Sequence, residues 1–229
     1  PYTTLFRSDG NLVCLRPQAT DEAGAFAIDV PASARCMGGG ALRVYSPDQP
    51  FATTYCDVEV VPPTGTDTLS LPDPFVVFPT TPASDLPAYG NAAALRTVSF
   101  GALAIDLAPD AFGFTFGEAE YGRLAAAAVD PTTPGLCFLD TPVDALWAFS
   151  PEANADKPVD FRLDNAQGYP PGSAVDLWIL GGLDTTLAGG EHVPEAEWVQ
   201  FGEARVSDDG ATIVGEAPAL TWLGLRRAD

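Results

Sequence analysis

Two stretches in the second half of the chain carry an aliphatic or aromatic residue at every second position. Residues 159–164 read VDFRLD and residues 175–180 read VDLWIL. A period of two places successive side chains on opposite faces of a β-strand. The intervening residues, NAQGYPPGSA, are rich in glycine and proline, which excludes a helix and supplies turn geometry. The stretch 149–180 therefore predicts two strands joined by a turn, as one layer of a β-sandwich.

Glycine and proline are abundant along the whole chain. Each contributes 22 of the 229 residues, without a collagen-like period. So many breakers favour short elements and many turns, and hence an all-β fold. Hydrophobic residues make up 46%, which is enough for a core. We expect an all-β protein with two antiparallel β-sandwich (Ig/transthyretin-like) units in series.

The chain is strongly acidic, with a net charge of −20. Such a surface repels phosphate backbones and anionic membranes, so nucleic acid and lipid are not expected partners. No apolar run reaches the roughly 18 residues of a membrane span, so no membrane insertion is expected. The acidic residues are scattered, which indicates a solvated surface rather than an acidic tail. Cations could act as counter-ions, but solubility alone accounts for the charge.

The first eight residues, PYTTLFRS, resemble the in-frame translation of a sequencing adapter. We expect residues 1–8 to be an assembly artefact in a gene fragment read from bulk, metagenomic sequence data. The true N-terminus and any signal peptide are then not readable from this sequence.

Residues 9–62 are predicted to form the first, smaller unit. NLVCLRP at 11–17 is strand-like, a turn is expected at 21–24, and residues 26–30 alternate again. After a triple glycine, ALRVY at 41–45 and TTYCDVEVV at 53–61 predict a second hairpin.

A motif in this unit resembles a known family. Thr20-Asp21, Gly24, Phe26 and Val30-Pro31 match the pattern T-D-x-x-G-x-F…V-P of carboxypeptidase regulatory-like and Cna B-type domains. The resemblance implies a small transthyretin-like sandwich of the kind common in secreted and surface bacterial proteins. It implies no peptidase chemistry. The unit has no lysine, so the Lys–Asn crosslink of some Cna B-type domains cannot form in it.

Residues 63–94 are crowded with proline and are predicted to be a linker of extended, semi-stiff backbone. One apolar run, at 75–78, could pair as an edge strand, where proline is tolerated.

Residues 95–229 are predicted to form the second sandwich. The alanine-rich run 124–129 has helix propensity. However, Gly122 and Asp130-Pro131 confine it to strand length, so a strand is expected. Asp208-Asp209-Gly210 predicts a hairpin turn. Besides the central pair, strands are expected within residues 95–100, 102–109, 122–130, 145–151, 197–207, 211–218 and 220–227.

The second unit also carries a resemblance, on Ser150-Pro151 and Lys157-Pro158-Val159. These positions match a motif of the β-sandwich domain shared by zonula-occludens proteins, ankyrins and netrin receptors. In that family the module mediates interactions or passes force and is not an enzyme.

The four cysteines, Cys14, Cys36, Cys56 and Cys137, include no C-x-x-C pair, and the chain has one histidine. Zinc is therefore not expected. An even count in an acidic, turn-rich β protein favours disulfides and an oxidising compartment. Cys14 with Cys36 is the preferred pair because they flank the first hairpin. The alternative is that all four are buried thiols.

No pattern in the sequence predicts a catalytic site. His192 lies in a loop beside Glu191 and Glu195, without a G-x-S-x-G elbow, and Cys137 has no base partner. Paired carboxylates could serve a glycosidase, but among 31 acidic residues no pair stands out. Asp208-Asp209-Gly210 lacks calcium-loop spacing, and no glycine run has the context of a phosphate loop.

Four tryptophans, all in the second unit, leave one ligand class open. A sugar-binding module would need two or three of them exposed and coplanar, whereas burial in a sandwich core is the commoner state of tryptophan. The four are Trp147, Trp178, Trp198 and Trp222.

The sequence thus predicts a non-catalytic structural or adhesive module of a secreted or cell-surface bacterial protein, located extracellularly or on the cell surface. Its partner would be a cell-surface protein or a polysaccharide. We assign no catalytic, cofactor or metal residues and expect no cofactor. The alternatives are a carbohydrate-binding module, or an accessory domain of a larger secreted hydrolase.

Overall fold

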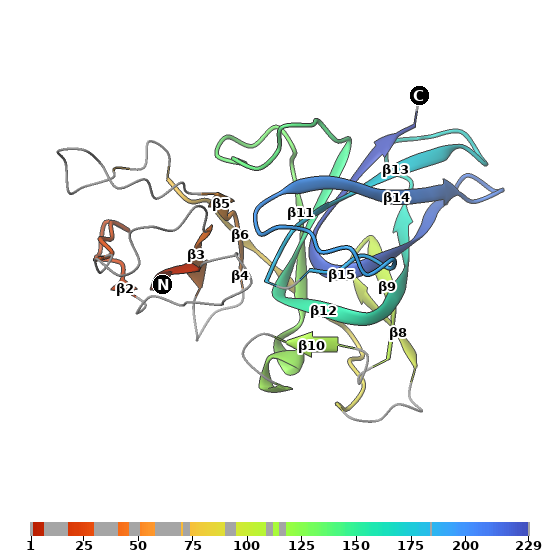
Figure 1. The fold of residues 1–229 in the computed structure, drawn as a ribbon. Helices are drawn as coiled ribbons and strands as arrows, with labels where there is room; N and C mark the ends of the chain where they lie inside the picture. Colours follow the sequence, from red (N-terminus) through yellow and green to blue (C-terminus); the bar gives the residue numbers. More distant parts are fainter. Residues whose placement is uncertain are drawn as a thin grey trace.

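The fold is all-β, with antiparallel strands throughout the described residues of this computed structural model (Figure 1). This confirms the predicted class. The structure describes residues 2–6, 18–29, 41–45, 51–57, 70, 74–89, 95–108, 112–114, 118–183 and 185–228. The strands are β1 (Tyr2–Phe6), β2 (Gln18–Ala19), β3 (Ala41–Tyr45), β4 (Phe51–Thr53), β5 (Cys56–Asp57), β6 (Val77–Pro79), β7 (Thr81–Pro82), β8 (Arg96–Phe100), β9 (Leu103–Leu107), β10 (Phe112–Phe114), β11 (Ala125–Val129), β12 (Ala145–Asp164), β13 (Ala174–Leu180), β14 (Trp198–Val206) and β15 (Thr212–Arg227), with one 3-10 helix, η2 (Glu118–Arg123).

The largest element of the fold is a nine-stranded sheet. Its main path runs β13-β14-β15-β12-β11-β7, and β9 and β10 also pair with β12, while β8 pairs with β9. Because β13 pairs with β15 as well as with β14, the sheet nearly closes on itself. We call this sheet the barrel. The predicted arrangement of two sandwiches in series is not confirmed, since the strands after residue 95 belong to one barrel-like sheet.

Two long strands, β12 and β15, run through the barrel. The sequence predicted two strands in place of each, because prolines interrupt both runs. In the structure each run is instead one continuous strand that contains bulges. The four residues 149–152 of β12 lie opposite the single residue Thr221 of β15, and residues 155–158 lie opposite the single residue Pro218. Bulges of this kind free a strand from ladder hydrogen bonds that proline cannot donate. All three prolines of the two strands lie in these bulges, so each strand bends and continues.

The alternating stretches of the sequence point into the barrel. Val159, Phe161 and Leu163 of β12 are buried in one cluster with Val175 and Leu177 of β13. The predicted face assignment of both strands is therefore confirmed. The Asp208–Gly210 turn between β14 and β15 is also confirmed, with Gly210 at φ 72°, where glycine carries no steric penalty.

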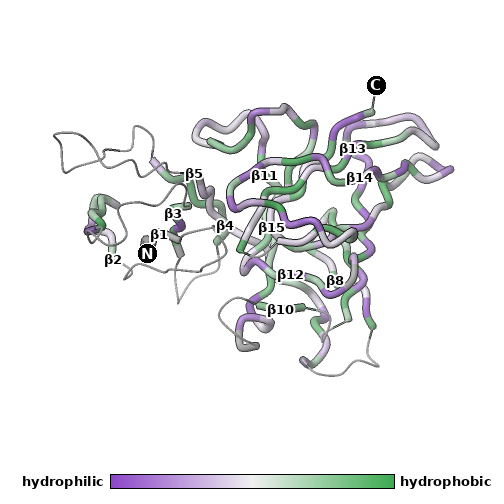
Figure 2. Tube along the Cα trace, in the orientation of Figure 1, coloured by the Kyte–Doolittle hydropathy of each residue, from purple (hydrophilic) through white to green (hydrophobic). Residues whose placement is uncertain are grey.

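A second core cluster lies on the outer side of the barrel wall. It joins outward residues of β11, β12 and β15 to Ala41, Ala52 and Tyr55 from the N-terminal part. β11 is thus buried on both faces, because Ala126 belongs to the inner cluster while Ala127 and Val129 belong to the outer one. This explains the unbroken apolar run at 124–129, which is a strand as predicted. Figure 2 shows hydrophobic residues along β11 and β15.

The N-terminal part contains a four-stranded sheet, β2-β1-β3-β5, and the pair β4-β6. The predicted pairing of ALRVY with TTYCDVEVV is confirmed by the register Ala41↔Asp57. Residues 2–6 form β1, which pairs with β3 over its full length. A short strand can pair whatever the origin of its sequence, so the expected artefact at residues 1–8 stays a prediction.

The first hairpin was predicted only in part. Its turn is present, since Asp21 Oδ1 accepts hydrogen bonds from the backbone N–H groups of Ala23 and Ala25. Residues 25–29, however, form no strand. No strand in the described part of the chain pairs with these residues, so the alternating pattern there does not become a β-strand. The strand expected at 11–17 lies outside the described residues.

The expected linker contributes strands to two sheets. β6 overlaps the predicted apolar run 75–78 and pairs with β4, and β7 pairs with β11 of the barrel. The proposed domain limits at 62 and 95 stay predictions. The two parts nevertheless share the outer core cluster described above.

Candidate functional site

The outer core cluster encloses an ionic group. The guanidinium of Arg43, on β3, lies between the carboxylates of Glu152, on β12, and Glu195, in the loop between β13 and β14. Arg43 Nε donates to Glu195 Oε1 at 2.6 Å, and Arg43 Nη1 donates to Glu152 Oε1. Tyr55 places its ring 3.8 Å from the guanidinium carbon. We call Arg43, Tyr55, Glu152 and Glu195 the Arg43 cluster.

Glu152 is positioned by the first bulge of β12. Its side chain keeps 19% of its surface exposed, and its Oε2 is buried without a hydrogen-bond partner in the described part of the chain. This oxygen packs against the β13–β14 loop: a Cβ built on Gly182 would stand 2.5 Å from it. A larger residue at position 182 would therefore force the Glu152 carboxylate to move.

Glu195 is positioned by the loop of residues 181–197. The loop is closed at its base by paired backbone bonds, from Gly181 N to Glu197 O and from Ala196 N to Gly181 O, both 2.8 Å. The side chain of Glu195 is only 2% exposed. Ala196 has φ 66°, a left-handed conformation that costs a residue with a Cβ about 1–2 kcal/mol. The loop thus holds Glu195 in place at the expense of local strain.

Buried hydroxyl and amide groups brace the same loop. Thr185 Oγ1 accepts from Gly182 N at 2.8 Å, and Thr221 Oγ1 donates to Leu180 O at 2.7 Å. Asn154 Nδ2 donates to Leu183 O at 2.8 Å. Each bond satisfies a backbone group that would otherwise be buried without a partner, which would destabilise the fold.

Tyr55 is almost fully buried, with 1% of its surface exposed. Burial raises the pKa of its hydroxyl well above the usual value, and the charge of Glu152 raises it further. Burial also works to lower the pKa of Arg43, but the negative charge of Glu152 and Glu195 outweighs it and raises that pKa. Arg43 therefore stays a cation at any pH at which the protein folds.

The two carboxylates are close enough for the chemistry of paired acids. Both bind one guanidinium, and glycosidases likewise place two carboxylates around one reacting bond. A glycosidase acid, however, needs a raised pKa so that it carries a proton at neutral pH. In this cluster each carboxylate is instead bound by the same guanidinium. The arrangement is therefore better suited to joining two parts of the chain than to proton transfer.

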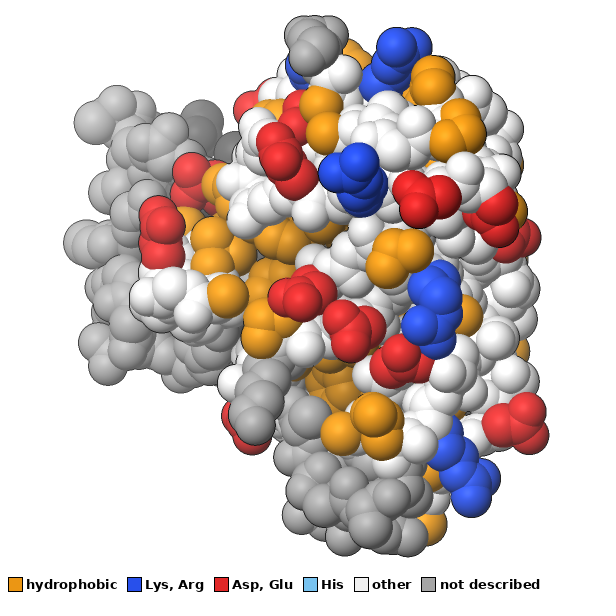
Figure 3. Space-filling model, turned by 90° about the vertical axis from the view of Figure 1, so that its right-hand side faces the viewer, with side chains coloured by type: hydrophobic (Ala, Val, Ile, Leu, Met, Phe, Trp, Pro, Cys, Tyr) orange, Lys and Arg blue, Asp and Glu red, His pale blue; other side chains and the backbone are white. Residues whose placement is uncertain are grey.

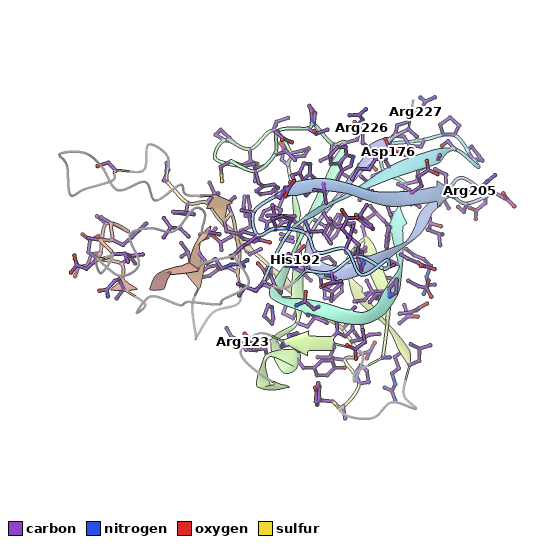
Figure 4. The ribbon with its side chains drawn as sticks, in the orientation of Figure 1. Arg123, Asp176, His192, Arg205, Arg226 and Arg227 are labelled. Carbon is purple, nitrogen blue, oxygen red and sulfur yellow. The ribbon has the colours of Figure 1, made fainter. Side chains whose placement is uncertain are left out.

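Residues singled out from the sequence lie apart from this cluster. His192 is exposed and forms an isolated bridge with Thr186 within the β13–β14 loop. Figure 4 shows it away from Arg205 and Arg227, which lie at the C-terminal end of the barrel. Within the described part of the chain, no three His, Cys, Asp or Glu side chains are arranged to hold a metal ion. Cys14 and Cys36 lie outside the described residues.

The tryptophans are core residues. Trp147, Trp198 and Trp222 are buried, and Trp178 is partly buried. Trp178 stacks on Trp198 with ring centroids 6.2 Å apart and an interplanar angle of 20°. Phe138 packs against both Trp198 and Trp222. The interpretation of these residues as sandwich-core tryptophans is therefore confirmed as regards their burial.

Sequence reasoning missed the Arg43 cluster. Arg43 and Tyr55 looked like ordinary strand residues, and Glu195 was noted only as a neighbour of His192. One local signal was available: ALRVY has a lone charge in the middle of an apolar strand. Its partners come from distant parts of the chain, and no spacing in the sequence links them.

The outer surface carries its charges in a mixed pattern. On the face shown in Figure 3, acidic and basic side chains are interspersed, in line with the scattered acidic residues of the sequence. No helix in the described part of the chain is both long and apolar enough to cross a membrane.

No protein-family model, curated protein or solved structure matches this chain. The resemblances to carboxypeptidase regulatory-like domains and to the domain of zonula-occludens proteins therefore stay predictions.

Proposed function

We propose that this chain is a non-catalytic structural or adhesive module of a secreted or cell-surface protein. The observation that carries the proposal is the use made of its buried charges. Arg43, Glu152 and Glu195 join the N-terminal part to the barrel, and they do so inside an aromatic core. Charged residues that bind one another in this way hold the two parts of the fold together and do not act in catalysis.

The aromatic residues support the same proposal. Tryptophan side chains that could stack on sugars or substrates are instead packed against one another and against Phe138. The scattered surface charge keeps such a module soluble and leaves recognition to local patches. A partner would be a cell-surface protein or a polysaccharide, bound through such a patch.

Two measurements test the proposal together. The purified chain is first assayed against chromogenic glycosides, esters and peptides, in parallel with Glu152→Gln. We expect no product above the level of the variant. Turnover that disappears in Glu152→Gln would overturn the non-catalytic assignment and revive the paired-carboxylate hydrolase.

The second measurement concerns cohesion and adhesion. Beads coated with the chain are held against surfaces bearing bacterial cell-wall material or polysaccharide, and detachment is measured under flow. We expect retention above that of beads coated with albumin, together with resistance of the chain to trypsin. A chain that detaches like albumin and is digested rapidly would contradict a structural or adhesive role.

A further inference from the structure

We propose that the barrel carries a preformed receptor site for a guanidinium group, built from Glu152 and Glu195, which this chain fills with its own Arg43. The occupant of this site is an arginine presented on an extended segment. The proposal rests on the geometry of the Arg43 cluster and does not depend on the adhesive role.

The first step is the shape of the site. The two carboxylates bind different nitrogens of one guanidinium, Nε and Nη1. A guanidinium offers five N–H donors in one rigid plane, whereas an ammonium is a compact point charge. The ring of Tyr55 covers the guanidinium at 3.8 Å, a distance at which a cation is attracted to an aromatic face. The site therefore selects a flat, forked cation.

The second step is that the barrel half of the site stands without Arg43. Glu152 is fixed by a bulge of the barrel wall and by contact with the loop at Gly182. Glu195 is fixed by the backbone bonds that close residues 181–197, and Val193 N adds a bond to Thr185 O at 2.9 Å. None of these contacts uses the N-terminal part. The backbone that carries both carboxylates would therefore stay in position if the arginine left.

The third step is that the arginine is brought to the barrel by side chains alone. In the described ladders β3 pairs with β1 and β5, and β4 pairs with β6, but neither pairs with a barrel strand. Ala41, Ala52 and Tyr55 contact the barrel through the outer core cluster. Residues 41–45 and 51–57 thus contact the barrel without adding a strand to it, and the partner of β4, β6, is followed along the chain by the barrel strand β7.

The fourth step is unused hydrogen-bonding capacity inside the site. Glu152 Oε2 is buried and has no hydrogen-bond partner among the described residues. Buried polar atoms of this kind are normally satisfied in native structures by a protein group or a bound molecule. Glu152 Oε2 can accept a further N–H group. The site can therefore bind a cation that carries more N–H groups than a single amine.

The test is chemical rescue of Arg43→Ala. The variant is refolded and its Tm measured in buffer alone, with ethylguanidinium chloride, and with ethylammonium chloride at the same low millimolar concentration and ionic strength. A ligand that binds only the native state raises Tm in proportion to the logarithm of its concentration. We expect ethylguanidinium to restore at least half of the lost Tm and ethylammonium to restore almost none. Wild-type protein, measured alongside, corrects for any denaturing effect of the salts.

Two further variants sharpen the result. Arg43→Ala combined with Glu195→Gln should lose the rescue, because one of the two acceptors is weakened. Arg162→Ala removes an arginine from an exposed pair with Asp106 and should show no response to ethylguanidinium. Equal rescue by both cations, rescue that survives Glu195→Gln, or an Arg43→Ala chain that fails to fold in every solution would each overturn a preformed guanidinium site.

Discussion

Arg43 Nε and Glu195 Oε1 are joined by a 2.6 Å hydrogen bond across 152 residues of sequence. Arg43 belongs to a small N-terminal sheet and Glu195 to a loop of the barrel, so the bond closes a very long section of chain. Such contacts form only after both parts have folded, because the entropy of loop closure opposes them until then. The Arg43 cluster therefore forms only when both the N-terminal part and the barrel are folded.

The first prediction concerns the two carboxylates of the cluster. Removing one partner of a buried ion pair typically costs about 3–5 kcal/mol, because an uncompensated charge is left behind. Glu195→Gln should approach this loss of unfolding free energy, since the side chain of Glu195 is 2% exposed. Glu152→Gln should lose less, because its side chain is 19% exposed and water can screen the charge. Urea unfolding followed by circular dichroism measures both.

The matched control is Asp106→Asn, which removes the same kind of charge from an exposed pair and should cost less than about 1 kcal/mol. A loss in Glu195→Gln no larger than in this control would show that the cluster does not hold the N-terminal part.

The second prediction concerns the glycine that makes room for Glu152. A methyl group at position 182 would stand 2.5 Å from Glu152 Oε2 and 2.9 Å from a methyl of Thr221. Gly182→Ala should therefore destabilise the fold by about 1–3 kcal/mol, the usual cost of overpacking. Gly189→Ala, in the same loop, meets no atom within 4 Å and should change little. Thermal unfolding of both variants is the measurement, and equal Tm values would refute the close approach.

Much of the barrel was predictable from local pattern. The alternation in β12 and β13 and the turn at 208–210 each reflect short-range chemistry, and each was placed correctly. The alanine-rich β11 was recognised because its flanking residues limited its length. Local reasoning failed where long-range pairing decides the outcome. The prolines of β12 and β15 suggested breaks, but the opposite strand accommodates them in bulges.

The candidate site could not be predicted for the same reason. Arg43 lies 109 residues from Glu152 and 152 residues from Glu195, so only the closed fold shows that they meet. The closure of the sheet likewise depends on the pairing of β13 with β15, which the local sequence of neither strand predicts.

The third prediction concerns tryptophan fluorescence. Trp147, Trp198 and Trp222 are buried in apolar surroundings, so emission should be blue-shifted in the native state and should move to the red on unfolding. Soluble polysaccharides should leave the native spectrum unchanged, because no buried ring can stack on a sugar without rearrangement. A saturable shift with one glycan would instead support the carbohydrate-binding alternative.

The fourth prediction concerns the cysteines. The even number of cysteines favours disulfides, and the preferred bond between Cys14 and Cys36 leaves Cys56 and Cys137 as the second pair. We therefore expect two crosslinked peptides in a proteolytic digest under non-reducing conditions, identified by mass spectrometry. One should contain Cys14 with Cys36 and the other should contain Cys137. A crosslink between Cys137 and either Cys14 or Cys36 would show the preferred pair to be wrong.

The fifth prediction is a pH dependence carried by Asp106. Hydrogen bonds from Arg162 Nη2 at 2.7 Å and from Thr97 Oγ1 hold the pKa of Asp106 below its ordinary value. A carboxylate with a depressed native pKa stabilises the fold above its unfolded pKa of about 3.9, and this contribution is lost as pH falls through the native pKa. Asp106→Asn should thus be less stable than wild type near neutral pH, by under about 1 kcal/mol because both side chains are partly exposed. The difference should disappear as the pH falls below the lowered native pKa of Asp106, where the wild-type side chain is also uncharged. Urea unfolding of both proteins across this range measures it, with Arg162→Gln expected to follow the same profile. A gap between wild type and Asp106→Asn that persists in acid would assign the loss to packing instead of charge.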